Sequence, residues 1–191
     1  MTGHSITELK RALKNIKAES TTTDQGAVKG KFKSMDEIRS ALGDLEVKQE
    51  SDVQVMLRLL GVIRGYEGSP EVVGSQGHLE LVTALQDIEY YIHQIDNAND
   101  FVKLGGFPDV IKLLNHSMSE VREESIHLIG SAAQSNPPVQ VELMGLNVMP
   151  MLLRQLSDPG ETPGVRKKCL FALSSMIRHF PLAQTKFGEI G

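Results

Sequence analysis

The sequence predicts an all-α fold, and three observations support this prediction. Apolar residues recur at three-to-four-residue spacing along most of the 191 residues. One apolar helix template returns after 41 and then 44 residues, and a corner of glycine or asparagine followed by proline returns after 42 residues. A period of about 40–47 residues built from two or three helices is typical of armadillo and HEAT arrays. Because the corner precedes a proline, we expect an armadillo-type helical solenoid.

Each repeat is predicted to contain a short first helix, a corner, a second helix and a longer third helix. Gly105, Asn147 and Gly191 occupy the corner, since glycine and asparagine tolerate the left-handed conformation, and Pro108 and Pro150 suit the first turn of the next helix. The third helices share the apolar spacing i, i+3, i+6, i+7. It is carried by Leu85, Ile88, Tyr91 and Ile92, by Ile126, Ile129, Ala132 and Ala133, and by Leu170, Leu173, Met176 and Ile177.

The chain is expected to divide at about residue 34. Residues 5–18 carry a capping box and an apolar stripe that predict a short helix, whereas residues 21–33 lack an apolar period and predict a flexible linker. Residues 1–33 are therefore an N-terminal helix and linker, and residues 34–191 are the repeat domain. Within it, residues 34–65 are predicted as an N-terminal helical cap and residues 71–191 as the repeats. The second cap helix carries an apolar stripe, which is Val53, Met56, Leu57, Leu60 and Ile63, and it ends at Gly65.

The two ends of the sequence suggest part of a longer protein. A fourth repeat is cut at Gly191 just as it begins, whereas solenoids normally finish with a polar capping unit. We therefore expect a solenoid truncated at its C-terminal end. Residues 1–9 lack the apolar stretch of a secretory signal, which leaves two alternatives, an intracellular protein or one trimmed of its leader.

Composition limits the classes of partner. Twenty basic against 24 acidic side chains give a formal net charge of −4, so no chain-wide attraction would hold the protein on nucleic acid or an anionic membrane. Apolar runs are interrupted by charge or are shorter than the roughly 20 residues that span a bilayer. We expect a protein partner, no nucleic acid and no membrane insertion.

No motif for catalysis, nucleotide binding or metal binding is recognisable. The glycine-rich phosphate loops and the Gly-x-Ser-x-Gly elbow are absent, and the six histidines lack the spacing of metal ligands on one helix face. Cys169 lies in an apolar helix, where a buried inert thiol is expected and a redox role is the alternative. The protein is predicted not to be an enzyme and to use no cofactor or metal.

Asn115 begins an N-glycosylation sequon, Asn115-His116-Ser117, between the second and third helices of a repeat. Such a connection should be exposed, so Asn115 is a candidate glycosylation site if the protein enters the secretory pathway. A chance sequon is the alternative.

Residues 87–98, DIEYYIHQIDNA, form the most distinctive segment, with a predicted buried stripe of Ile88, Tyr91, Ile92 and Ile95. Third helices of armadillo solenoids stack side by side and line one face. Outward polar positions on successive third helices therefore predict a continuous groove that binds a partner, with a solvated face as the alternative. The predicted contact residues are Glu89, Tyr90, His93, Asp96, Asn97, Gln134, Arg178 and His179, and corresponding outward positions are Ser131, Asn136 and Ser175.

Several motifs resemble the Sil-type nucleotide exchange factors of the endoplasmic reticulum. They are EYYIHQIDNA at 89–98, GG at 105–106, SNPPVQVE at 135–142 and RHFP at 178–181, and weaker likeness extends upstream over most of the chain. The family is related to cytosolic exchange factors with an armadillo fold. The resemblance implies that the groove grips the nucleotide-binding domain of BiP, the luminal seventy-kilodalton heat-shock chaperone, and promotes ADP release without binding nucleotide itself.

The resemblance implies the lumen of the endoplasmic reticulum, with the cytoplasm as the alternative. The alternative function is an armadillo-type adaptor that holds an extended peptide in its groove and leaves the nucleotide cycle untouched. Such adaptors usually repeat tryptophan and asparagine along the groove, and this chain has no tryptophan. That absence favours the exchange factor.

Overall fold

The computed structural model describes residues 50–67 and 75–190, and all regular structure within these two ranges is helical. The predicted N-terminal helix, the linker, the first cap helix and Gly191 lie outside the described residues. The helices are α4 (Asp52–Glu67), α5 (Ser75–Ile92), α6 (Ile95–Lys103), α7 (Gly106–Lys112), α8 (Ser119–Ala133), α9 (Pro137–Gly145), α10 (Val148–Ser157), α11 (Pro163–Ile177) and α12 (Pro181–Ile190), and a 3-10 turn, η2 (Leu113–Asn115), follows α7.

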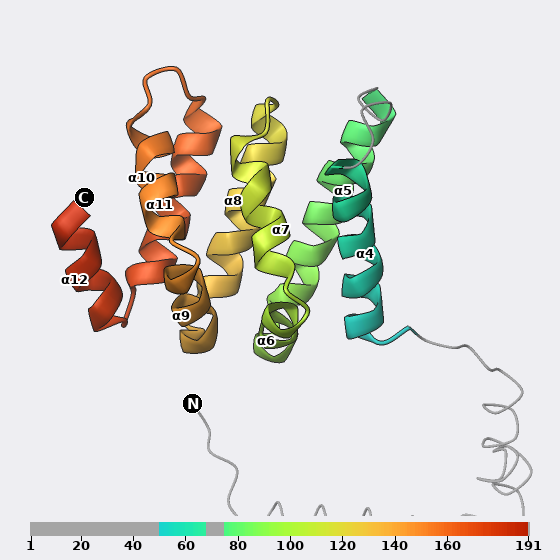
Figure 1. The fold of residues 1–191 in the computed structure, drawn as a ribbon, viewed down its shortest axis with the longest axis horizontal. Coiled ribbons are helices and arrows are strands. Elements are labelled where there is room, and N and C mark those ends of the chain that lie inside the picture. Colours follow the sequence, from blue (N-terminus) through green and yellow to red (C-terminus); the bar gives the residue numbers. More distant parts are fainter. Residues whose placement is uncertain (1–49, 68–74, 191) are drawn as a thin grey trace, which may run out of the picture. The chain divides into compact units, whose positions relative to one another are not determined.

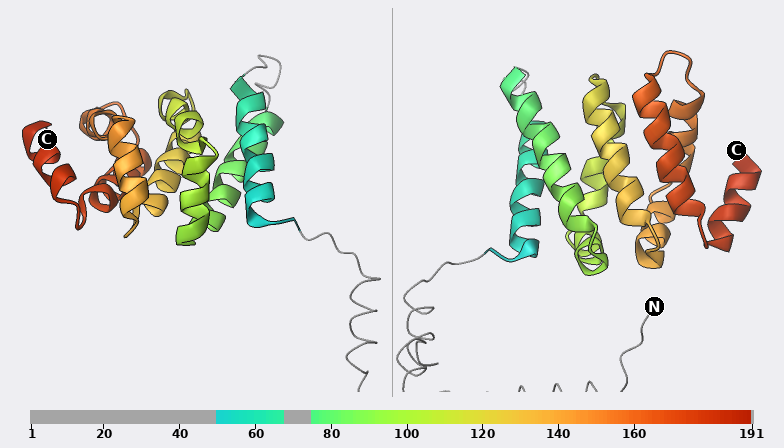
Figure 2. Two further views of the ribbon diagram at one scale, coloured as in Figure 1. Left: turned by 60° about the horizontal axis from the view of Figure 1, so that its bottom comes forward. Right: turned by 180° about the vertical axis from the view of Figure 1, so that it is seen from behind.

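The described helices form a solenoid of three-helix repeats, as the period predicts (Figure 1). The third helices α5, α8 and α11 lie side by side in one layer, and α8 packs against both of its neighbours (Figure 2). The three run in the same direction and end at the edge where α6, α9 and α12 begin. Equivalent residues of successive repeats therefore come close together at that edge.

Two left-handed corners separate the first and second helices of the repeats. Gly105 has φ 65° and ψ 35°, and Asn147 has φ 57° and ψ 37°, so both adopt the conformation that their residue types predict. Pro108 and Pro150 lie in the first turns of α7 and α10, where a proline costs no hydrogen bond. The predicted corner motif is confirmed at both positions.

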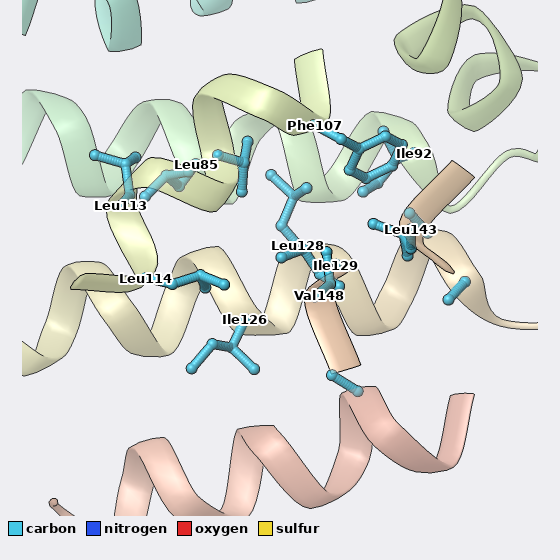
Figure 3. Packing of buried hydrophobic residues seen from close by; sticks show 14 of the residues in the cluster. Leu85, Ile92, Phe107, Leu113, Leu114, Ile126, Leu128, Ile129, Leu143 and Val148 are labelled. Atoms are coloured by element: carbon cyan, nitrogen blue, oxygen red, sulfur yellow. The ribbon is translucent and has the colours of Figure 1, made fainter. Parts of the chain in front are cut away.

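The core cluster includes buried residues from α4 to α12. Figure 3 shows its middle part, with labelled side chains from Leu85 of α5 to Val148 of α10. Leu85, Ile88 and Ile126 are fully buried at the positions that the repeat template predicts. Phe101 of α6 packs edge-to-face on Phe107 of α7, with ring centroids 5.1 Å apart. Burying each large apolar side chain contributes about 1.5–3 kcal/mol, so stacked repeats supply the stability that a single repeat lacks.

Three residues predicted to be buried are exposed. Leu170 is 57% exposed, although its counterparts Leu85 and Ile126 are buried, because no third helix of the described part follows α11 and covers that flank. Ile95 is 56% exposed because α5 ends at Ile92 and Ile95 begins a new helix. Leu57 is 50% exposed on α4, whose described neighbours are α5, α6 and α7.

Two smaller differences concern α4 and α5. The helix α4 continues through Gly65 to Glu67, because a lone glycine weakens a helix by only about 1 kcal/mol. Tyr91 is only partly buried, although it packs against the core cluster. Within residues 50–67 and 75–190, no helix combines the length and apolarity needed to cross a membrane.

Candidate partner-binding face

The predicted contact residues gather where the third helices end. Because α5 ends at Ile92, α8 at Ala133 and α11 at Ile177, four of them lie in the turns that follow and not on the helices themselves. These four are His93, Gln134, Arg178 and His179. We call the exposed surface formed by the last turns of α5, α8 and α11 and by these following turns the third-helix face.

Two of the third helices are followed by a residue in the left-handed backbone conformation. Ser135 has φ 51° and His179 has φ 57°, and Pro137 and Pro181 then begin the next helices. Neither residue is glycine or asparagine, so their types alone did not predict these corners. Their repeat spacing, together with the proline two residues later, is the signal that could have found them.

Glu89 is the centre of a polar cluster between α5 and α8. Its Oε1 atom accepts a 2.6 Å hydrogen bond from Ser131 and lies 2.9 Å from Nε2 of His93 and 3.7 Å from Nε2 of His127. The Glu89 side chain is 15% exposed. A carboxylate this deeply placed needs several polar partners, and it orients both imidazoles on the third-helix face.

Tyr90 and Tyr91 differ in environment although they are neighbours. Tyr90 is 72% exposed, whereas Tyr91 packs against the core cluster. The two rings meet edge-to-face, with centroids 5.5 Å apart. Tyr90 therefore presents a large, partly fixed aromatic surface to solvent, and its exposure agrees with the predicted orientation of the helix.

Asn97 is buried and therefore does not belong to the exposed surface. Its Nδ2 atom donates to Oδ2 of Asp52 at 2.8 Å and to the carbonyl of Tyr91 at 3.0 Å. Through Asn97 of α6, these two bonds connect the end of α5 to the start of α4. Asn97 thus positions the turn that carries His93, while its neighbour Asp96 remains exposed.

Three further polar positions predicted to point outward are also buried. Ser131, Asn136 and Ser175 are 5%, 2% and 4% exposed. Ser131 and Ser175 lie on the flanks where α8 meets α5 and α11 meets α8, so neighbouring third helices cover them. A polar residue at a helix–helix seam cannot be told from a solvent-facing one by its type alone.

Arg178 borders a hollow between the ends of α8 and α11. The hollow has a volume of about 310 Å³ and is lined by Gln134, Ser135, Phe171, Ser174, Ser175 and Arg178. Buried Gln140 donates from Nε2 to the carbonyls of Ser175 and Arg178, at 2.9 and 3.0 Å, and fixes the backbone there. The exposed Arg178 guanidinium is then free to meet a partner, since no described carboxylate pairs with it.

Close packing of α8 on α11 forms the floor of this hollow. Gly130 of α8 lies against Phe171 of α11, and a Cβ atom built at Gly130 would come within 2.5 Å of that ring. Phe171 also lies beside His127, with ring centroids 5.6 Å apart. The structure adds Phe171 and Ser174 to the predicted face.

The remaining candidate residues lie elsewhere. Asn115 is exposed at the end of η2, and its Oδ1 atom accepts a 3.0 Å hydrogen bond from Arg154. Cys169 is buried, and burial together with the charge of Glu161 raises the pKa of its thiol to about 11. Within the described ranges, no group of three or more His, Cys, Asp or Glu is arranged to hold a metal ion.

Comparison with known proteins agrees with the resemblance seen in the motifs. Residues 97–191 match the model of the family described as SIL1/FES1/HPBP1 C-terminal domain. This part of the chain belongs to the SIL1/FES1/HPBP1 family. The match begins at Asn97 and includes α8, α11 and the turns that follow them, so it covers the Arg178 side of the third-helix face.

Curated relatives of the SIL1/FES1/HPBP1 family extend the likeness to nearly the whole chain. Nucleotide exchange factor SIL1 of Rattus norvegicus is 37% identical over 96% of this chain and 39% of its own length. The SIL1 protein of Xenopus laevis is 36% identical over 96% of this chain and 40% of its own length. Hsp70 nucleotide exchange factor FES1 of Gibberella zeae is 27% identical over 90% of this chain and 76% of its own length. The chain thus spans about two fifths of the SIL1 relatives.

Proposed function

We propose that this chain acts as a nucleotide exchange factor and co-chaperone that binds the nucleotide-binding domain of BiP in the lumen of the endoplasmic reticulum. The observation that carries the proposal is the match of residues 97–191 to the SIL1/FES1/HPBP1 family. Relatives named nucleotide exchange factor SIL1 cover 96% of the chain and support the luminal branch.

The exposed side chains of the third-helix face support a protein–protein contact. Tyr90 and Arg178 are the proposed energetic anchors, because tyrosine and arginine are enriched among residues whose truncation costs about 2 kcal/mol or more. Tyr90 is widely exposed, and Arg178 has an available guanidinium on a fixed backbone. The other proposed contacts are Glu89, His93, Asp96, Gln134 and His179.

Exchange by this route needs binding energy and no chemical step. A protein that binds the open chaperone more tightly than the closed, ADP-filled one shifts the population toward the open state and speeds ADP release. A tenfold shift requires a difference in binding free energy of about 1.4 kcal/mol. The two anchors supply this difference when their contacts form with the open chaperone and not with the closed one.

Release of labelled ADP from purified BiP tests the proposal. We expect the chain to accelerate release, and we expect Tyr90→Ala and Arg178→Ala each to weaken binding to BiP by about thirtyfold, equivalent to about 2 kcal/mol. Arg154→Ala is the matched control. It removes another exposed arginine, one that lies beside Asn115 and not on the third-helix face.

Binding to BiP without faster ADP release would support the adaptor alternative. Equal effects of Arg178→Ala and Arg154→Ala would remove the third-helix face from the proposal but leave exchange intact. Absence of binding to BiP, together with acceleration of a cytosolic Hsp70, would contradict the luminal assignment and favour the cytoplasm.

A further inference from the structure

A cluster of one tyrosine and two histidines lies away from the third-helix face. Tyr66 is near the end of α4, His78 is near the start of α5, and His116 lies between η2 and α8. Each pair of rings is in contact: centroids are 5.9 Å apart for Tyr66 and His78, 5.6 Å for Tyr66 and His116, and 5.4 Å for His78 and His116. The cluster joins three segments that are distant in sequence.

Hydrogen bonds link His116 to the backbone of Met118 and to the Tyr66 hydroxyl. The backbone N–H of Met118 donates to Nδ1 of His116 at 3.1 Å, so this nitrogen carries no proton. The neutral His116 ring then carries its proton on Nε2, which lies 3.3 Å from the Tyr66 hydroxyl oxygen. The Tyr66 hydroxyl oxygen also lies within hydrogen-bonding distance of Nδ1 of His78, 3.4 Å away.

The Met118 hydrogen bond requires the His116 imidazole to be neutral, because a proton added at Nδ1 of His116 would point at the Met118 N–H. Nε2 of His78 is buried and has no hydrogen-bond partner among the residues described. Protonation of His116 at Nδ1 therefore breaks the link between this ring and the Met118 backbone.

The charged groups around the cluster do little to stabilise a protonated imidazole ring. Arg122 of α8 donates from its guanidinium to the His116 carbonyl at 2.7 Å, and its charge is already balanced by Glu161 at 2.5 Å. The remaining charged groups around the hollow beside His116 are Arg154 of α10 and Asp158 of the connection between α10 and α11. No carboxylate forms an ion pair with either imidazole in the parts of the chain that the structure describes.

We propose that Tyr66, His78 and His116 form an acid-sensitive clasp that fastens α4 and α5 to the segment before α8 at neutral pH and releases it on acidification. The clasp acts on the N-terminal side of the third helices, whereas the proposed chaperone contacts lie at their C-terminal ends. Its action is therefore read from the structure of the chain itself and does not depend on the partner.

The pKa of His116 also supports a clasp that is closed at neutral pH and released in acid. Burial lowers this pKa below its ordinary value of 6.5, and the nearby His78 and Arg122 lower it further. Because the folded-state pKa lies below the unfolded one, the neutral clasp stabilises the fold fully above about pH 6.5. That contribution is lost as the pH falls through the folded-state pKa.

Amide exchange and imidazole NMR on the full chain test the clasp. Between about pH 7.5 and about pH 5.5, we expect the protection factor of the Met118 amide to fall by about tenfold, because protonation of Nδ1 of His116 removes the acceptor of its hydrogen bond. Nitrogen-15 shifts should show His116 without a proton on Nδ1 at the higher pH, and its signal should move on acidification.

Two asparagine variants form the matched pair. His116→Asn keeps an oxygen that can accept the Met118 N–H in an Asx turn but removes the titrating ring, so Met118 should stay protected in acid. His179→Asn makes the same change at an exposed left-handed position and should leave the acid response of the wild type intact.

Either of two results would overturn the proposal. One is an acid loss of Met118 protection in His116→Asn as large as that in the wild type. The other is a wild-type His116 ring that carries its proton on Nδ1 at neutral pH, a measurement that remains decisive if the variant fails to fold.

Discussion

Ser131 of α8 donates a 2.6 Å hydrogen bond to Oε1 of Glu89 on α5, although 42 residues separate them. The separation equals one structural repeat, so the bond joins neighbouring third helices directly beneath the proposed contact surface. Ser131 is 5% exposed. The Glu89 carboxylate that receives this bond also holds His93 in place.

Removing this bond should destabilise the seam between α5 and α8. We expect Ser131→Ala to lower the free energy of unfolding by about 2 kcal/mol, because hydrogen bonds to charged groups contribute about 1.5–3 kcal/mol. Urea unfolding measures the change. Ser174→Ala, at an exposed serine of α11, is the control and should change stability by less than about 0.5 kcal/mol. If Ser131→Ala and Glu89→Gln have additive effects on the free energy of unfolding in a double-mutant cycle, the two side chains do not interact as this prediction requires.

Substitutions of the neighbouring residues Tyr90 and Tyr91 should have different effects, one on chaperone binding and the other on stability. Tyr91→Ala should lower the free energy of unfolding by about 3 kcal/mol, or somewhat less, since the ring packs on the core but is only partly buried. Tyr90→Ala should leave stability nearly unchanged and weaken chaperone binding. Thermal unfolding and binding are measured for both variants. The reverse pattern would mean that the orientation of α5 assigned here is wrong.

Asn97 should be needed for folding and not for direct contact. Asn97→Ala leaves the Asp52 carboxylate and the Tyr91 carbonyl without their shared donor, and we expect a loss of about 2 kcal/mol. Asn97→Asp should cost more, because it places a second carboxylate beside Asp52. Asp96→Ala, one residue away and exposed, is the matched control for chemical denaturation. If Asn97→Ala is as stable as the wild type and loses only chaperone binding, Asn97 belongs to the contact surface after all.

Asn115 should accept a glycan when the protein is made in the secretory pathway. Asn115 is exposed, and its side chain accepts a hydrogen bond from the exposed Arg154, which a glycan can replace. Expression in secretory cells followed by glycosidase treatment should give one shift in electrophoretic mobility. Ser117→Ala removes the sequon and should abolish the shift. An unmodified wild type would show that this connection is not accessible to the transferase.

Cys169 should be unreactive in the folded protein. Burial raises the pKa of its thiol from 9.0 to about 11, and reaction with thiol reagents requires the thiolate. Because the folded-state pKa is the higher one, the protonated thiol stabilises the fold fully below about pH 9 and loses this effect as the pH rises toward 11. Modification by a disulfide reagent at neutral pH should therefore follow the rate of unfolding. Fast modification under native conditions would support a redox role.

The sequence by itself determined the repeat and its corners. Apolar spacing identified α5, α8 and α11, because residues three and four apart share one helix face and that face must be buried. Gly105 and Asn147 marked the left-handed corners, because few other residue types adopt that conformation readily. The exposed Tyr90 was also found in this way.

Only the tertiary structure decided which polar residues are covered. Asn97, Asn136 and Ser131 were predicted to face outward and are instead buried. Leu170 matches a buried template and is exposed, because burial depends on whether another third helix packs on that flank. The apolar spacing along a helix predicts the direction in which each side chain points from that helix. Whether the side chain is exposed depends on which other parts of the chain pack against that side.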